Sequence, residues 1–399
     1  MKILQLCSRV PYPPDNGGSI AMLALTHCLK EEGNDIFILS INTPKHHFDL
    51  KNLPPQMHSI AHWDAVDIDT TINPIDAFLN LFTYKSYHIQ RFYKPNFENK
   101  LIELLKQENF DVILIESLFV TPYIPAIRKH SQAKIIYRAH NIEFKIWERM
   151  LEGMKSSLKK QYLTLQIKRL KSYERNIINK PDAIVSITPE DKEAFINLGS
   201  KLPLYVTPIS INSNDFNYPE HHNRYPVLFH LGSMNWLPNL EAIDWFLDNL
   251  WPNLHNKYPA LKLYIAGRGM PDRLIKSNIP SLYVYDQVDD AKAWMNAKDI
   301  MIVPLLSGSG MRVKIIEGMA LGKTIISTTI GAEGIAYTHL ENILIADTTE
   351  EFVSMIDLCI NDFEFCKTIG RNAKELVKDH YDNKRVGEEL NDFLLHLIK

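Results

Sequence analysis

Residues 300–323 read IMIVPLLSGSGMRVKIIEGMALGK. The run Ile300–Pro304 is apolar and short, which is typical of a buried strand, and Val313–Ala320 has the spacing of a helix. A loop with two glycines joins them, and Gly322 follows the helix as a stop signal. A strand, a loop and a helix in this order form the building unit of parallel α/β sheets, so this stretch predicts an α/β fold.

The same alternation of short apolar runs and helical patterns extends over both halves of the chain. The expected strands are Lys2–Cys7, Asp35–Ser40, Val112–Glu116, Lys134–Arg138, Ala183–Ile187, Val227–Leu231, Lys262–Ala266, Leu282–Tyr285, Ile300–Pro304 and Thr324–Ser327. The expected helices include Ser19–Glu32, Asn96–Gln107, Asn239–His255, Ala291–Lys298, Val313–Ala320 and Val386–Ile398. The pattern predicts two Rossmann-like domains in tandem, with parallel sheets that face an interdomain cleft.

A polar, turn-rich stretch, Thr207–Tyr225, interrupts the alternation and is typical of an interdomain linker. The 399 residues are too many for one ordinary core, which also favours at least two domains. We predict an N-terminal domain over residues 1–207 and a C-terminal domain over residues 208–385. The last helix, 386–399, is expected to return to the N-terminal domain.

Composition excludes several classes of protein. Lys plus Arg number 44 against 47 Asp plus Glu, so the net charge of −3 does not favour nucleic-acid binding. Hydrophobic residues at 45% and charged residues at 23% are typical of a soluble globular protein. The four cysteines lack CxxC spacing, so we expect reduced thiols. Because neither a signal peptide nor a spanning run is apparent, we expect a cytoplasmic protein with peripheral membrane contact at most.

The glycine loop of residues 300–323 is the strongest candidate for a ligand site. Gly308 and Gly310 let a ligand approach the backbone, while Arg312 and Lys314 add two cations beside a helix N-terminus. Such loops follow the carboxyl ends of parallel strands, where open α/β sheets bind their ligands. These groups suit a diphosphate, and the Glu317 carboxylate is placed to accept hydrogen bonds from sugar hydroxyls.

A second glycine loop follows the first expected strand and contains Gly17 and Gly18. A glycine pair before a helix allows a ligand to approach the backbone and the free N–H groups of the first turn. A plain turn with a helix cap would have the same sequence. The loop is neither a GxGxxG fingerprint nor a Walker loop, so both interpretations stay open.

These motifs together resemble the GT-B glycosyltransferases of the large retaining family GT4, also known as glycosyl transferases group 1. The resemblance rests on Gly308–Gly322 together with the Gly17-Gly18 turn. Arg138–Glu143, which reads RAHNIE, resembles the histidine-bearing loop of the family's first domain. Gly232–Asn239, which reads GSMNWLPN, resembles the loop that opens the second domain. The resemblance covers nearly the whole chain and is least specific over residues 42–110.

The resemblance implies three catalytic residues. Arg312 and Lys314 are expected to hold the donor diphosphate and to stabilise the charge on the departing nucleoside diphosphate. His140 is expected near the transferred sugar, although a lone histidine after a strand is more often structural. Glu317 would match the second acid of the family's E-x7-E pattern and bind the ribose.

The resemblance also implies a set of donor-binding residues. Gly310 and Met311 would present backbone N–H groups, and Gly18 would approach the diphosphate from the other domain. Ser233 and Asn235 would reach the phosphates or the acceptor. The expected donor-binding residues are Gly17, Gly18, Gly232, Ser233, Asn235, Arg268, Gly308, Ser309, Gly310, Met311 and Glu317. Arg268 either contacts the base or merely caps a strand.

The chain departs from the family pattern at Ser309. This serine stands eight positions before Glu317, where the family has its first acid. That acid helps to bind hydroxyls of the donor sugar. The resemblance therefore implies the diphosphate site but leaves the identity of the sugar open.

Metal chemistry is not predicted. Asp67-Ile68-Asp69 matches the DxD of metal-dependent GT-A transferases, but so short a pattern recurs by chance and no strand end is recognisable there. The pairs His46-His47 and His221-His222 lack spaced partner ligands. Neither a Ser-His-Asp order nor a nucleophile elbow stands out. We expect no cofactor and no metal, and the nucleotide sugar would be a substrate.

Residues 151–180 combine a helical pattern with a strong positive charge. They hold eight basic and two acidic residues, a local net charge of +6. One interpretation is a solvated helix packed on the first sheet. The other is a surface that docks on anionic lipid headgroups at the inner face of the membrane.

The predicted function is a retaining glycosyltransferase of the hexosyltransferase type. It would move a sugar from a UDP- or GDP-linked donor to a hydroxyl of a saccharide or lipid-linked acceptor, in surface polysaccharide or glycolipid synthesis. The alternatives are a nucleotide-sugar epimerase of the same architecture, a dinucleotide-dependent oxidoreductase and a non-catalytic carbohydrate-binding protein. The missing GxGxxG argues against the second, and the cluster of Arg312, Lys314 and Glu317 argues against the third.

Overall fold

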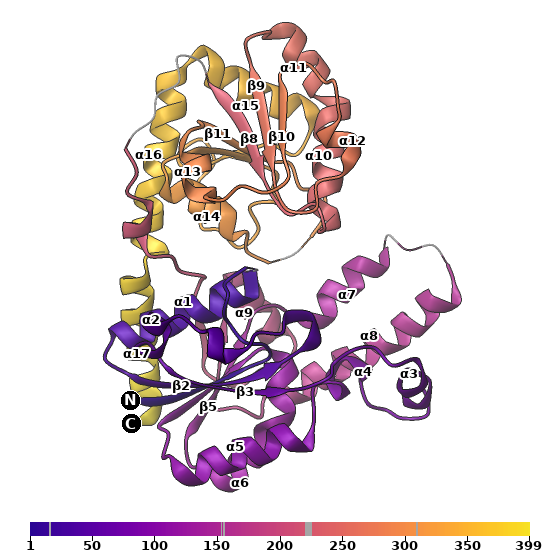
Figure 1. Cartoon of the computed structure of the whole chain (residues 1–399), viewed down its shortest axis with the longest axis vertical. Helices are drawn as coiled ribbons and strands as arrows, with labels where there is room; N and C mark the ends of the chain where they lie inside the picture. The colour runs from indigo at the N-terminus through magenta and orange to yellow at the C-terminus, as the bar shows by residue number, and fades with distance from the viewer. Residues whose placement is uncertain (16, 153, 155, 220–225, 309) are drawn as a thin grey trace. The chain divides into compact units, whose positions relative to one another are not determined.

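The chain folds into two compact units, which a computed structural model describes over residues 1–15, 17–152, 154, 156–219, 226–308 and 310–399 (Figure 1). Unit 1 comprises Met1–Ser210 and Asn383–Lys399, and unit 2 comprises Ile211–Asp382. The structure thus places the division after Ser210 and begins the returning segment at Asn383. Each unit is a parallel α/β sheet of the GT-B kind, as the sequence predicts.

Unit 1 contains a seven-stranded parallel sheet in the order β3-β2-β1-β4-β5-β6-β7. Its strands are β1 (Lys2–Cys7), β2 (Asp35–Asn42), β3 (His62–Asp67), β4 (Val112–Glu116), β5 (Lys134–Ala139), β6 (Ala183–Ser186) and β7 (Leu204–Val206). All residues of β4 are buried, because helices cover both faces of the sheet. The central strands are therefore mostly apolar, with charge near their ends and one buried polar residue, Gln5, in the middle of β1.

The helices of unit 1 include the last helix of the chain. They are α1 (Gly17–Glu31), α2 (Pro55–His58), α3 (Pro74–Asn80), α4 (Tyr87–Gln90), α5 (Pro95–Gln107), α6 (Ile124–His130), α7 (Glu143–Glu152), α8 (Leu158–Ile177), α9 (Pro189–Asn197) and α17 (Asn383–Ile398), with 3-10 turns at Pro44–His46, Leu50–Asn52 and Leu118–Tyr123. Leu390 and Leu394 of α17 are buried in the same core cluster as Met22 of α1. Gly387 allows the close approach, because a Cβ there would contact the Cys28 backbone.

Unit 2 contains a six-stranded parallel sheet in the order β10-β9-β8-β11-β12-β13. Its strands are β8 (Val227–Leu231), β9 (Lys262–Ala266), β10 (Leu282–Tyr285), β11 (Ile300–Val303), β12 (Thr324–Ser327) and β13 (Leu344–Ile345). Its helices are α10 (Leu237–Asn249), α11 (Trp251–Lys257), α12 (Asp272–Ile275), α13 (Ala291–Asn296), α14 (Val313–Ala320), α15 (Thr349–Asn361) and α16 (Phe363–His380), with a 3-10 turn at Ser213–Phe216.

Several details differ from the prediction. The strands β3, β7 and β13 were not predicted, because β3 and β7 are only partly buried edge strands and β13 has two residues. The expected helix over Asn239–His255 is two helices, since Pro252 lacks the N–H that would continue the first. The basic stretch 151–180 is likewise not one helix. It contains the end of α7 and then α8, whose first turn is capped by Ser157.

The DxD match also lies in a different place from the one expected. Asp67 is the last residue of strand β3, so a strand does end there. Its carboxylate accepts a hydrogen bond from the Asn42 side chain at 2.8 Å, while Asp69 accepts from the backbone and hydroxyl of Thr71. Among the helices that the structure describes, none has both the length and the apolar character needed to cross a bilayer.

Candidate functional site

Three neighbouring strands of unit 2 carry the predicted donor-binding loops at their carboxyl ends. Gly232 follows β8, Gly267 follows β9, and the glycine loop around Gly308 follows β11. Because β9, β8 and β11 are adjacent in the parallel sheet, the three loops lie along one edge. This is the position in which open α/β sheets bind ligands.

The loops after β8 and β9 are held together by backbone hydrogen bonds. The Met234 N–H and the Ser233 hydroxyl both donate to the carbonyl of Arg268, at 2.9 and 3.3 Å. Gly267 has a φ of 154°, and a Cβ there would overlap the carbonyl of Gly232. Only glycine fits this approach, which brings the predicted residues Ser233 and Arg268 side by side.

The loop after β11 turns its arginine toward the loop after β8. Gly308 and Gly310 have φ of 121° and 84°, values that favour glycine. The Arg312 guanidinium donates to the carbonyl of Gly310 and lies over the Trp236 ring, 5.2 Å from its centroid. The aromatic face stabilises the cation at the beginning of α14. Ser309 lies outside the described residues.

Lys314 and Glu317 lie in the first turns of α14. Burial lowers the pKa of Lys314, an effect that Glu317 opposes and that the nearby positive charge of Arg268 reinforces. Burial raises the pKa of Glu317, against the influence of Lys314 and Lys292. Two cations and one acid thus lie close together where the strands end, next to the helix N-terminus.

His230 belongs to the same edge of the sheet and was not predicted. Its ring is almost fully buried, and Nδ1 lies 2.9 Å from the Ile302 carbonyl, so Nδ1 carries the proton. Burial lowers the pKa of His230 to about 4, and Lys314 acts in the same direction. Within the described residues Nε2 has no hydrogen-bond partner, and it lies next to Gly232. In the sequence, the only sign of His230 is that a polar residue interrupts an apolar strand.

In unit 1 the predicted His140 follows β5 and contacts a carboxylate that was not predicted. Its Nε2 lies 2.6 Å from Glu116 Oε2, at the end of the neighbouring strand β4. Burial opposes ionisation of Glu116, but Arg138, His140 and Gln5 together lower its pKa to about 2. Burial lowers the pKa of His140, so the neutral ring donates from Nε2 and keeps Nδ1 as an acceptor.

The carboxylate of Glu116 also connects His140 to helix α1. The Arg138 guanidinium donates to Glu116 at 3.1 Å and to the Ala21 carbonyl at 3.2 Å. The Gln5 amide donates to Glu116 at 2.8 Å and to the Met22 carbonyl at 3.2 Å. The histidine loop is therefore joined to the first turns of α1. An acid at the end of an otherwise apolar strand is the signal that the sequence offers for Glu116.

Gly17 is the first residue of α1 and Gly18 the second, so the glycine pair opens a helix as expected. A Cβ on Gly17 would meet nothing within 4 Å, which means that packing does not require glycine there. Gly17, Gly18 and His140 belong to unit 1. The other described residues of the predicted site, which are Gly232, Ser233, Asn235, Arg268, Gly308, Gly310, Met311, Arg312, Lys314 and Glu317, belong to unit 2.

Glu143, the last residue of the RAHNIE loop, has an unusual carboxyl group. Burial raises its pKa to about 7, against the influence of Arg9. The group therefore exchanges its proton near neutral pH. It also begins helix α7, where a carboxylate would be stabilised by the helix dipole.

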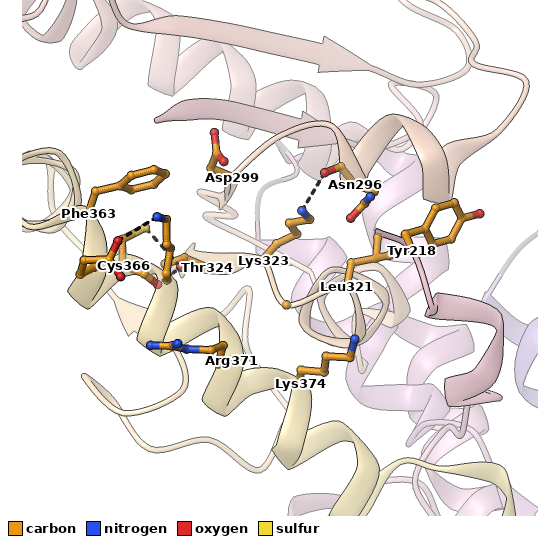
Figure 2. Close-up of a pocket in the computed structure, with 13 residues that line it drawn as sticks. Tyr218, Asn296, Asp299, Leu321, Lys323, Thr324, Phe363, Cys366, Arg371 and Lys374 are labelled. Atoms are coloured by element: carbon orange, nitrogen blue, oxygen red, sulfur yellow. Dashed lines mark hydrogen bonds and ion pairs between the residues drawn. The ribbon is translucent and has the colours of Figure 1, made fainter. Parts of the chain in front are cut away.

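A cationic cavity lies at the opposite edge of the sheet in unit 2 (Figure 2). Its volume is about 310 Å³, and it is located where strand β12 begins at Thr324. The Lys323 ammonium donates to the Asn296 carbonyl at 2.7 Å, and Lys367 pairs with Glu364 at 2.8 Å. The cavity lies at the amino ends of β11 and β12 and is therefore separate from the loops that follow the carboxyl ends of β8, β9 and β11.

The structure describes no group of three or more His, Cys, Asp or Glu side chains that could hold a metal ion. His46 lies 3.3 Å from Arg9, and His47 lies 3.6 Å from Asp67. The pair His221-His222 lies outside the described residues.

Two family profiles match the two halves of the chain. The family described as Glycosyltransferase Family 4 matches residues 15–214, and the one described as Glycosyl transferases group 1 matches residues 225–362. An uncharacterized 44.6 kDa protein in the cps region of Klebsiella pneumoniae is 25% identical, over 96% of this chain and 97% of that protein. An uncharacterized glycosyltransferase of Methanocaldococcus jannaschii is 21% identical, over 93% and 92%.

Solved structures share the fold over the full length. Anabaena HepE in complex with UDP has a TM-score of 0.69 and 14% identity, covering 99% of this chain and 100% of that chain. Sucrose-phosphate synthase of Thermosynechococcus elongatus has a TM-score of 0.71 and 14% identity, covering 100% and 99%.

Proposed function

This chain belongs to the group 1 glycosyltransferases, and from that premise we propose that it transfers a sugar with retention from a UDP- or GDP-linked donor to a hydroxyl group. The observation that carries the proposal is the cluster of Arg312, Lys314 and Glu317 at the beginning of α14. Its two cations suit the diphosphate of a donor, and its acid suits the hydroxyls of a ribose. Solved relatives of the same fold in complex with UDP and with UDP-glucose support testing uridine donors first.

The proposed reaction exchanges one bond to the anomeric carbon for another. The acceptor oxygen attacks on the face from which the diphosphate leaves, the bond from C1 to the phosphate oxygen breaks, and that oxygen takes the acceptor's proton. Negative charge grows on the leaving diphosphate, so cations from Arg312 and Lys314 stabilise the transition state more than the ground state. We propose that these side chains serve in place of a metal ion.

His140 would serve as a hydrogen-bonding group for the transferred sugar. With Nε2 held by Glu116, the neutral ring offers Nδ1 to a hydroxyl. The acceptor proposed is a saccharide or a lipid-linked saccharide of surface polysaccharide or glycolipid synthesis, at the cytoplasmic face of a membrane. The four cysteines, all reduced and buried, agree with a reducing compartment.

A panel of nucleotide sugars tests the proposal. UDP-glucose, UDP-galactose, UDP-N-acetylglucosamine and GDP-mannose would be assayed for nucleoside diphosphate release, with and without saccharide acceptors and EDTA. We expect release that needs an acceptor and survives EDTA, and a product whose anomeric configuration, measured by NMR, equals that of the donor.

Each part can fail separately in this assay. If the protein binds neither UDP nor GDP in calorimetry, the proposed class of donor is refuted. An inverted product would refute retention, and loss of release in EDTA would refute the metal-free mechanism. Conversion of the donor to its epimer without an acceptor would identify the alternative, a nucleotide-sugar epimerase.

A further inference from the structure

The cationic cavity of unit 2 is lined by more positive than negative charge (Figure 2). Its charged lining residues are the cations Lys323, Lys367, Arg371 and Lys374 and the acids Asp299 and Glu364. Three of the cations belong to helix α16, where the spacing i, i+4 and i+7 places them on one side of the helix. Lys323 lies on the facing segment, directly before strand β12.

Two of these cations form no ion pair. Lys367 pairs with Glu364, one turn earlier on α16, at 2.8 Å. Arg371 donates to the hydroxyl of Thr368 at 2.9 Å and influences Glu364 only at longer range. Within the residues that the structure describes, neither Arg371 nor Lys374 has a carboxylate within 4 Å. With four cations and two acids in the lining, a positive charge of two remains uncompensated.

Another buried lysine adds to the positive charge at this end of the sheet. Lys298 and Lys323 are each only 6% exposed. Burial and the positive charge of Lys323 lower the pKa of Lys298 to about 8. The Lys298 ammonium donates to the Trp294 carbonyl at 2.6 Å and lies over the ring of the same residue. An anion that entered the cavity would therefore be attracted by several cations at once.

The end of helix α14 does not explain Arg371 and Lys374. Cations beside a helix C-terminus commonly balance its dipole, and α14 ends next to the cavity. However, the backbone N–H groups of residues 321–323 already donate to carbonyls of the last turn of α14, at 2.8 to 3.1 Å. Among the described residues, no hydrogen bond joins Arg371 or Lys374 to these carbonyls.

Backbone contacts, rather than the cations, form the walls of the cavity. A Cβ on Gly370 of α16 would overlap the carbonyl of Gly322, so the two backbones touch. Next to this contact, the Thr324 hydroxyl donates to the Cys366 carbonyl at 2.5 Å. The volume of about 310 Å³ corresponds to about ten water molecules at about 30 Å³ each. The cavity is therefore preformed and has room for a small anion with an organic part.

We propose that this cavity binds a phosphate group between Arg371 and Lys374, either as inorganic phosphate or as the monoester of a small molecule. A phosphate dianion supplies the two negative charges that the lining lacks, and a guanidinium can donate to two of its oxygens. A carboxylate would supply only one charge. Because the cavity lies at the amino ends of the strands, this inference does not depend on the proposed donor site.

Calorimetry with the full chain tests the proposal. The probes are inorganic phosphate, glucose 6-phosphate and, without the charge, glucose. We expect binding of at least one phosphate probe and no binding of glucose; the tighter of the two phosphate probes identifies the source of the group. R371A/K374A should weaken binding by at least about tenfold. Both residues lie on a helix, where alanine is favourable, so its melting temperature without ligand should stay unchanged.

Two matched variants separate this cavity from net charge and from the donor site. K276A/K378A removes two exposed lysines of unit 2 outside the cavity and should keep full phosphate binding. R312A/K314A removes two cations of the candidate donor site and should retain the phosphate site that R371A/K374A loses.

Four results would overturn the proposal. They are no binding of either phosphate probe, wild-type affinity in R371A/K374A, an equal loss in K276A/K378A, and loss of all phosphate binding in R312A/K314A. The third result would attribute binding to net charge alone. The fourth would assign the phosphate to the loops at the carboxyl ends of the strands.

Discussion

The two units treat charge near their candidate residues in opposite ways. In unit 1, Glu116 and Arg138 are fully buried and neutralise each other within the strands that position His140. In unit 2, Arg312 and Lys314 stand at a glycine loop, and the positive charge of Arg268 lies near Lys314. The charges of unit 1 compensate each other inside the protein, whereas in unit 2 Lys314 is attracted by Glu317 and repelled by Arg268.

This difference distinguishes a buried pair whose charges balance from a cluster that holds more cations than acids. A compensated network holds a side chain in one orientation, so its value lies in preorganisation. In unit 2 three cations, Arg268, Arg312 and Lys314, accompany one carboxylate, Glu317, and a bound diphosphate would balance the remaining positive charge. Substitutions of the buried pair Glu116 and Arg138 should therefore affect stability first, and substitutions of Arg312 and Lys314 should affect activity first.

The largest expected effect is on the stability of unit 1. Glu116→Gln leaves the buried Arg138 without a counter-charge, which should lower the free energy of unfolding by about 3–5 kcal/mol in urea titrations. The double variant E116L/R138M removes both charges and should regain much of that loss. A Glu116→Gln protein as stable as the wild type would show that the network does not stabilise the unit.

The next effect is on catalysis in unit 2. Arg312→Ala and Lys314→Ala should each lower kcat by about a hundredfold to a thousandfold, because the leaving diphosphate loses a cation. Lys314→Ala should change the melting temperature only slightly, because it removes both the attraction to Glu317 and the repulsion from Arg268. Lys276→Ala, at an exposed lysine of the same unit, is the control. Activity near wild type would reject the role assigned to both cations.

A smaller effect is expected at the residue that the unit 1 network holds. His140→Ala should lower kcat by about tenfold, the value of one hydrogen bond, with little change in the unfolding midpoint. His140→Gln should restore part of the activity through its amide. If both variants lose stability rather than turnover, His140 is a structural residue, like Glu116 and Arg138.

The smallest effect concerns the pH dependence of stability. The folded protein keeps the Glu143 proton up to about pH 7, whereas the unfolded chain releases it near the ordinary value of 4.5. The folded state therefore binds more protons between these values, and its stability falls as pH rises through them. Urea titrations from pH 5 to about 8 should show a shallower fall in Glu143→Gln. An identical slope in both proteins would contradict the raised pKa of Glu143.

Much of the fold could be predicted because strands buried in a parallel sheet have short, mostly apolar sequences. The strands β1, β4, β8, β9, β10 and β12 have the predicted bounds, and α14 begins and ends as expected. The edge strands β3 and β7 gave weak signals, since their side chains are only partly buried. The partly buried edge strand β10 was nevertheless predicted with its observed bounds, so complete burial is not required for a strand to be recognised.

The candidate site divides in the same way. Arg312, Lys314 and Glu317 are close in sequence, so one loop and one helix turn reveal them together. The partners of Glu116 and His230 lie on other strands: Glu116 contacts His140, and His230 contacts Ile302. In the sequence, each of the two appears only as a polar residue in an apolar run. Local spacing could not show which partners they have.

The sequence by itself determined the α/β class, the organisation into two domains and the cationic glycine loop. These features depend on periodicity and on residues that are neighbours in the chain. Only the tertiary structure decided that Glu116 holds His140, that His230 lies behind Gly232, and that helix α3 turns its apolar side outward. The pattern of α3 alone predicts a face buried in the core. Instead, Asn80 is buried by hydrogen bonds from Gln166 and Arg169, and no local pattern records contacts over such a separation in sequence.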